Sequence, residues 1–167
     1  MKPTSTQMAA NDPTVAAAVQ RAKKLLHRRA LAAAAASVVP IPGLDWAVDA
    51  ALLSRLIPQI SAEFGISAEQ LDQLDPKKRE QVQKAVGLVG SVLIGKMITR
   101  EVVIRLTQSM GLRFTTKQVA KYVPLAGQAL AATLGYATLR YLGEQHLRDC
   151  VRVVHQSGLK LQGPSLQ

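Results

Sequence analysis

Three observations predict an all-α fold for this chain, a compact bundle of about four longer helices joined by short connecting helices. Hydrophobic residues make up 48% of the 167 residues, which is enough to bury a core within a single domain. No segment shows the period-2 alternation that is typical of a strand. Residues that start and stop helices recur along the whole sequence. A single cysteine, Cys150, also excludes a disulfide scaffold.

The first long helix is predicted to begin at Asp12-Pro13 and to continue to about Val38. Aspartate is a good N-cap, and proline is favoured at the first helical position. At 100° per residue one stripe of this helix is apolar and faces the core; its members are Val15, Val19, Ala22, Leu26 and Ala33. We expect residues 1–12 to form a disordered arm, residues 13–157 a single helical domain, and residues 158–167 a flexible tail.

Proline, glycine and capping residues mark the helices that follow. Two prolines and a glycine stop the first helix, namely Pro40, Pro42 and Gly43. The second helix is predicted from about Asp45 to Phe64, with Gly65 suited to the left-handed position after it. Ser67-Ala68-Glu69-Gln70 has the spacing of a capping box and opens a short helix.

The second half of the chain is predicted to contain two long helices. Asp75-Pro76 repeats the favourable start and opens a helix to about Met110. Pro124 interrupts the region that follows, and a last helix runs to about Gln156, before Gly158.

Two ladders of small residues at i, i+4 and i+8 predict a close crossing of these two helices. The first ladder is Gly87, Ser91 and Gly95, and the second is Gly127, Ala131 and Gly135. A glycine inside a helix costs about 1 kcal/mol relative to alanine, so several glycines need a compensating contact. Tight packing within a bundle is the preferred interpretation, and a role in a membrane is the alternative.

The longest uncharged run, Tyr122–Leu139, has the length of a marginal membrane span. Its polar residues and its early proline make it a poor one, so we expect a buried core helix. The N-terminus is polar and lacks the apolar core of a secretory signal peptide. These features predict a cytoplasmic protein that is at most peripheral at the inner face of a membrane.

No arrangement of residues indicates catalysis, so we expect no enzyme activity, no cofactor, no bound metal and no small-molecule substrate. The segment Gly90–Met97 has the spacing of a phosphate-binding loop, but Met97 replaces the required hydroxyl and the segment is predicted to be helical. His146, Asp149 and Cys150 share a helix face, but a zinc site needs three or four ligands. A solvated histidine and aspartate beside a half-buried cysteine is the preferred interpretation.

The chain carries a net charge of +10, and its densest group of basic residues lies in the first helix. The candidate contact residues, here called the basic cluster, are Arg21, Lys23, Lys24, Arg28 and Arg29. Basic side chains are attracted to acidic lipid by about 1 kcal/mol each, whereas the alternative is a solvated helix face. Nucleic acid is not an expected partner, because stacking aromatic residues are scarce and no recognition motif is present.

Two proline-containing segments carry a likeness to known proteins. The first runs from Ala36 through Pro40-Ile-Pro-Gly43 to Leu53, and the second is Lys121-Tyr-Val-Pro-Leu-Ala-Gly127 with the helix after it. Over roughly residues 30–155 the chain resembles the helical domain that follows the GTPase domain in immunity-related GTPases. It is also similar to bacterial GTPase-associated helical domains of unknown function. The resemblance implies an all-α domain that acts beside a GTPase; the 167 residues contain no GTPase domain, so nucleotide hydrolysis is not implied.

The function expected from the sequence is that of a non-enzymatic helical module. It would associate peripherally with an anionic membrane surface, or with a membrane-linked partner of the GTPase type. The alternative is a soluble accessory bundle that forms homo-oligomers or binds a protein partner without contacting lipid.

Overall fold

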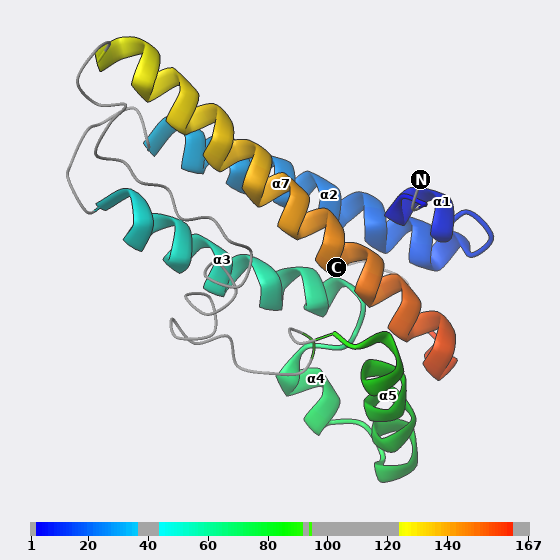
Figure 1. Cartoon of the computed structure of the whole chain (residues 1–167). Helices are drawn as coiled ribbons and strands as arrows, with labels where there is room; N and C mark the ends of the chain where they lie inside the picture. The colour runs from blue at the N-terminus through cyan, green and yellow to red at the C-terminus, as the bar shows by residue number, and fades with distance from the viewer. Residues whose placement is uncertain (1–2, 37–43, 92–93, 95–123, 162–167) are drawn as a thin grey trace, which may run out of the picture.

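A computed structural model describes residues 3–36, 44–91, 94 and 124–161. These residues form helices and turns without a strand, which confirms the all-α prediction for the described part of the chain. The helices are α1 (Ser5–Met8), α2 (Pro13–Ala36), α3 (Leu44–Glu63), α4 (Ala68–Asp72), α5 (Pro76–Val89) and α7 (Pro124–Ser157). Figure 1 shows α2 and α7 side by side and antiparallel, with α3 along them and α4 and α5 beyond the end of α3.

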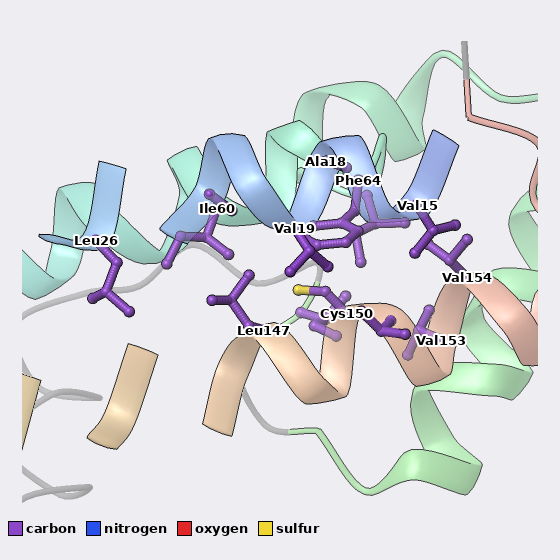
Figure 2. Packing of buried hydrophobic residues seen from close by; sticks show 14 of the residues in the cluster. Val15, Ala18, Val19, Leu26, Ile60, Phe64, Leu147, Cys150, Val153 and Val154 are labelled. Carbon is purple, nitrogen blue, oxygen red and sulfur yellow. The ribbon is translucent and has the colours of Figure 1, made fainter. Parts of the chain in front are cut away.

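The core lies where α2, α3 and α7 meet. The predicted stripe of α2 is confirmed, because all five of its members are at most 5% exposed. Phe64, at the end of α3, and Leu147 of α7 are completely buried and pack with Val19 around one centre (Figure 2). Burying a side chain of this size contributes about 1.5–3 kcal/mol, so this junction sets the arrangement of the three long helices.

Capping residues begin the helices at the positions that the sequence predicts. Asp12 accepts the backbone N–H of Thr14 at 2.9 Å, ahead of α2. Ser67 and Gln70 form the capping box of α4. Asp75 accepts two backbone N–H groups of the first turn of α5. Each cap satisfies donors that the first turn of a helix leaves unpaired, and such a side chain typically contributes about 1 kcal/mol.

The helix predicted from Asp75-Pro76 to about Met110 begins as predicted but does not continue past Val89, because Gly90 adopts a left-handed φ of 70°. Residues 95–110 lie outside the described residues. Glycine takes this conformation without steric cost, so a glycine in an apolar run can end a helix as readily as line a helix contact. Gly87 and Ser91 therefore do not lie on one helix face, and Gly95 lies outside the described residues. The prediction that Gly90–Met97 is helical fails at Gly90 for the same reason.

The other prolines and glycines on which predictions rest lie as follows. Pro40, Pro42 and Gly43 lie outside the described residues, between α2 and α3. Pro124 is the first residue of α7. The second predicted ladder, Gly127, Ala131 and Gly135, lies in the first half of α7. None of the described helices combines the length and the hydropathy that a membrane span requires.

The two ends of the chain differ from the expected disordered arm and flexible tail. Within residues 3–12, α1 is an ordered turn of helix, and Ser5 and Ala9 are completely buried. At the other end, Leu159 and Leu161 pack against the core, and residues 162–167 lie outside the described residues. A few apolar side chains and backbone N–H groups are enough to hold a terminal segment against the core, even where most of its residues are polar.

Candidate functional site

Two residues of the basic cluster connect α2 to α3. Arg21 Nε donates to Glu63 Oε2 at 2.6 Å, and Arg29 Nη2 donates to Gln59 Oε1 at 3.4 Å. Both side chains of the ion pair are partly exposed, at 40% and 31%, so the pair contributes less than about 1 kcal/mol. The two arginines are thus engaged within the molecule, which the sequence pattern did not indicate.

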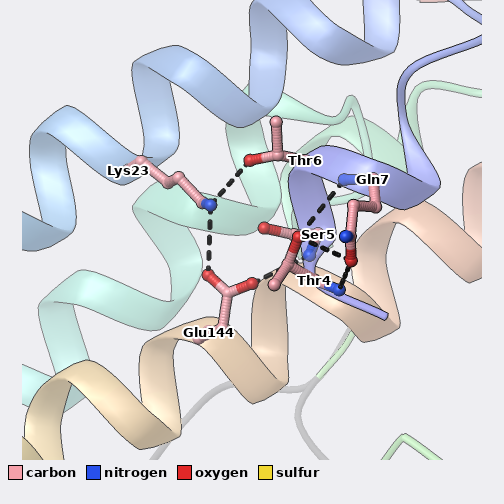
Figure 3. A network of polar contacts seen from close by, with 6 residues as sticks. All are labelled: Thr4, Ser5, Thr6, Gln7, Lys23 and Glu144. Atoms are coloured by element: carbon pink, nitrogen blue, oxygen red, sulfur yellow. Dashed lines mark hydrogen bonds and ion pairs between the residues drawn. The ribbon is translucent and has the colours of Figure 1, made fainter. Parts of the chain in front are cut away.

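Lys23 lies at the junction of α1, α2 and α7 (Figure 3). Its Nζ donates to Thr6 Oγ1 of α1 at 2.7 Å and lies 3.6 Å from Glu144 Oε2 of α7. The other carboxylate oxygen of Glu144 accepts the backbone N–H of Ser5 at 2.8 Å. A carboxylate therefore offsets the charge of Lys23 in this conformation.

Lys24 and Arg28 are the members of the basic cluster that face solvent. They lie one helical turn apart, both are exposed, and neither forms an ion pair with a described residue. No aspartate or glutamate occurs anywhere in α2. Because no carboxylate on their own helix offsets them, these two cations set a positive potential on the outer side of α2.

The structure adds Arg140 of α7 to these two residues. The Tyr136 hydroxyl lies 3.3 Å from Nδ1 of His27, which joins α7 to α2 one turn before Arg140. Glu144, which pairs with Lys23, lies one turn after it. Arg140 therefore lies between two contacts that join α7 to α2, and it is exposed without an ion pair to a described residue. We call Lys24, Arg28 and Arg140 the basic face.

Sequence reasoning missed Arg140 because its neighbours on α2 lie more than a hundred positions away. The residues around Arg140 do not indicate which helix packs beside α7. The antiparallel packing of α2 against α7 is part of the tertiary structure, which the local sequence does not specify (Figure 1).

A second polar cluster lies buried between α3 and α7. The Ser61 Oγ lies 3.0 Å from His146 Nε2, and Cys150 Sγ lies 3.5 Å from the same nitrogen. His146 and Cys150 are completely buried, so the prediction of a solvated histidine beside a half-buried cysteine is wrong. The i, i+4 spacing was interpreted correctly as one face, but that face points to α3 rather than to water.

Burial decides the chemistry of this second cluster. It lowers the pKa of His146 to about 4, while the backbone of Ile57 acts weakly in the opposite direction. Burial also raises the pKa of the Cys150 thiol far above its ordinary range. Both groups are therefore neutral near pH 7, and the thiol is not activated as a nucleophile. Within the described part of the chain, no three side chains of the metal-binding types come together.

Two curated proteins are similar in sequence to this chain, the Interferon-inducible GTPase 5 of Bos taurus and that of Rattus norvegicus. Each is 30% identical to it over 131 residues, which is 73% of this chain and 27% of the relative. The matched part thus spans about a quarter of the length of these relatives. No protein-family model and no solved structure matches the chain. The comparisons therefore link the chain to the immunity-related GTPases through distant sequence similarity.

Proposed function

We propose that this chain is a helical module that works beside a GTPase and docks peripherally on an anionic membrane surface through its basic face. The observation that carries the docking is the placement of three exposed cations, Lys24, Arg28 and Arg140, on two packed helices without a carboxylate partner among the described residues. The association with a GTPase rests on the similarity to Interferon-inducible GTPase 5.

The attraction to such a surface follows from simple electrostatics. Each basic side chain close to acidic lipid contributes about 1 kcal/mol, so the basic face supplies about 3 kcal/mol. The attraction is limited to about one Debye length, roughly 8 Å at physiological ionic strength, so added salt weakens it.

An exposed apolar residue of α2 supports a membrane rather than a purely ionic partner. Leu31, one turn after Arg28, is 50% exposed. Residues three or four positions apart lie on the same face of a helix, so Leu31 shares the outer face of α2 with Arg28 and Lys24. The two cations and this leucine together form an amphipathic surface for the interface.

The proposal assigns no catalytic step to this chain. Among the described residues, Ser61, His146 and Cys150 combine the side-chain types used in nucleophilic catalysis. These three side chains are enclosed between α3 and α7. A nucleophile has to reach its substrate, and its base has to accept a proton near the working pH. A buried thiol and a histidine with a pKa of about 4 meet neither requirement.

Charge reversal on the basic face tests this function. We expect Lys24→Glu/Arg28→Glu to weaken binding to phosphatidylcholine vesicles that contain phosphatidylserine by at least about 30-fold, because two contributions of about 1 kcal/mol are lost. Co-sedimentation with vesicles, with and without phosphatidylserine, measures the change.

The matched control is Lys77→Glu/Lys160→Glu, which changes the net charge by the same amount at exposed positions outside α2. It should bind the acidic vesicles nearly as the parent does. Equal losses in the two double variants would show that net charge alone matters. A parent protein that does not sediment with acidic vesicles would contradict the proposed docking altogether.

A further inference from the structure

The first described residues lie across the junction between α2 and α7, where the basic face begins. We call residues 3–12, which include α1, the N-terminal latch. α1 contacts both long helices, Ser5 and Ala9 are completely buried, and Met8 packs against the core. Figure 3 shows the latch beside the side chains of Lys23 and Glu144.

Three contacts tie the latch to one ion pair. Ser5 N–H donates to Glu144 Oε1 at 2.8 Å, which places Oε2 of the same carboxylate 3.6 Å from Lys23 Nζ. The Lys23 ammonium also donates to Thr6 Oγ1 at 2.7 Å. The latch therefore holds both partners of the pair, although it supplies neither of them.

The pair that the latch holds adjoins the basic face on both helices. Lys23 precedes Lys24 on α2, and Glu144 lies one turn after Arg140 on α7. In the latched conformation Lys23 is neutralised and its side chain is only 31% exposed. A released Lys23 would add a fourth cation beside the other three.

We propose that the N-terminal latch is a releasable strap that withholds Lys23 from the basic face, so that its release strengthens binding to anionic lipid. This inference rests on the proposed function. The latch contains only a single turn of helix. The buried Oγ of Ser5 has no hydrogen-bond partner among the described residues, which weakens the docked state.

The first test removes one contact and leaves α1 able to form. Ser5 is the first residue of α1 after its N-cap, Thr4. Proline is tolerated at this position and lacks the N–H that Glu144 accepts. We expect Ser5→Pro to accelerate amide hydrogen exchange over residues 3–12, and to raise the affinity for phosphatidylserine-containing vesicles about fivefold, the equivalent of one basic side chain.

Lys23→Gln shows whether Lys23 is responsible for the gain. In the double variant Ser5→Pro/Lys23→Gln, the fivefold increase should disappear. An equal increase in the Lys23→Gln background would overturn the proposal, since it would mean that another residue carries the effect.

A second variant reaches the same contact from α7. Glu144→Gln removes the carboxylate from Lys23 and keeps an oxygen for the Ser5 N–H, and we expect it to strengthen vesicle binding about fivefold. Its control is Glu80→Gln on α5, which makes the same charge change and frees Lys84 from an exposed ion pair at 2.8 Å. Equal effects of the two variants would overturn the latch, even where Ser5→Pro fails to fold.

The failure of the latch and the failure of the proposed function are distinguishable. A parent protein that binds through the basic face, together with a released Ser5→Pro variant that binds no better, overturns the latch alone. Absence of vesicle binding in the parent and in every variant overturns both. Binding that appears only in Ser5→Pro and Glu144→Gln supports the latch and shows that the latched chain is inactive on membranes.

Discussion

Lowering the pH from 7 to 5 should reduce the free energy of unfolding by about 2 kcal/mol through His146 alone. Burial lowers the pKa of this imidazole in the folded protein to about 4, whereas an unfolded chain holds histidine near its ordinary pKa of about 6.5. Below pH 6.5 the unfolded state therefore binds more protons than the folded state, so stability falls as the pH falls. The contribution is fully present above pH 6.5 and is lost by about pH 4, with a total near 3 kcal/mol.

Urea unfolding at the two pH values measures this effect, and His146→Gln is the control. The glutamine amide cannot titrate in this range, and its terminal group extends to the position of Nε2, the ring atom that lies 3.0 Å from the Ser61 hydroxyl. Its unfolding free energy should change by less than about 1 kcal/mol between the two conditions. An NMR titration of the parent gives an independent check, because a His146 ring that titrates near pH 6.5 in the folded protein would contradict the burial.

Gly143→Ala should destabilise the protein by about 1–3 kcal/mol through overpacking. A Cβ atom at this position of α7 would overlap Leu26 Cδ1 and lie 2.6 Å from Leu26 Cδ2. Leu26 belongs to α2, is 1% exposed, and can retreat only by disturbing the core. Thermal and urea unfolding of the variant measure the cost.

Gly87→Ala provides the opposite expectation within the same chain. This glycine lies in α5, and no atom comes within 4 Å of the place where its Cβ would stand. The better helix propensity of alanine should therefore stabilise the protein by up to about 1 kcal/mol.

A Gly143→Ala variant at least as stable as the parent would contradict the close approach of α2 and α7. Adding Leu26→Ala to Gly143→Ala should cost less than the sum of the two single changes.

The contact at Gly143 shows what a pattern of small residues cannot predict, namely the helix against which they pack. Gly143 continues the i+4 series of Gly127, Ala131 and Gly135 two turns farther along α7. The predicted packing of Gly87 against this series is wrong, because no atom lies within 4 Å of the place where a Cβ at Gly87 would stand. Gly143 was not part of the prediction, and a pattern on one helix does not specify its partner. The described contact is made to Leu26 of α2.

Local signals were the most predictable part of the fold. Asp12, Ser67 and Asp75 begin helices as predicted, because a cap depends on a few adjacent residues. Gly65 and Gly158 take the left-handed conformation expected at helix ends. Gly90 takes it too, but its apolar surroundings suggested that the helix continues. The choice between ending and continuing a helix is made by packing, which the local sequence does not contain.

The candidate site was predictable only in part, because the partners of its side chains are set by tertiary packing. The basic cluster was visible in α2, but the sequence did not show that Arg21 and Lys23 have partners on other helices. It also did not show that Arg140 lies between two residues of α7, Tyr136 and Glu144, that contact α2. Charge density along the chain is a property of sequence, whereas the free charge on a surface depends on which side chains are neutralised in the fold.

Site-specific labelling tests the docking of the basic face on membranes most directly. Leu31 and Leu88 are exposed leucines on α2 and α5, so Leu31→Cys and Leu88→Cys form a matched pair for an environment-sensitive fluorophore. The native Cys150 is completely buried and is the sole other cysteine. With phosphatidylserine-containing vesicles, the label at position 31 should brighten and shift to the blue, and the label at position 88 should not change. No response at position 31, or equal responses at both positions, would contradict docking through the α2–α7 face.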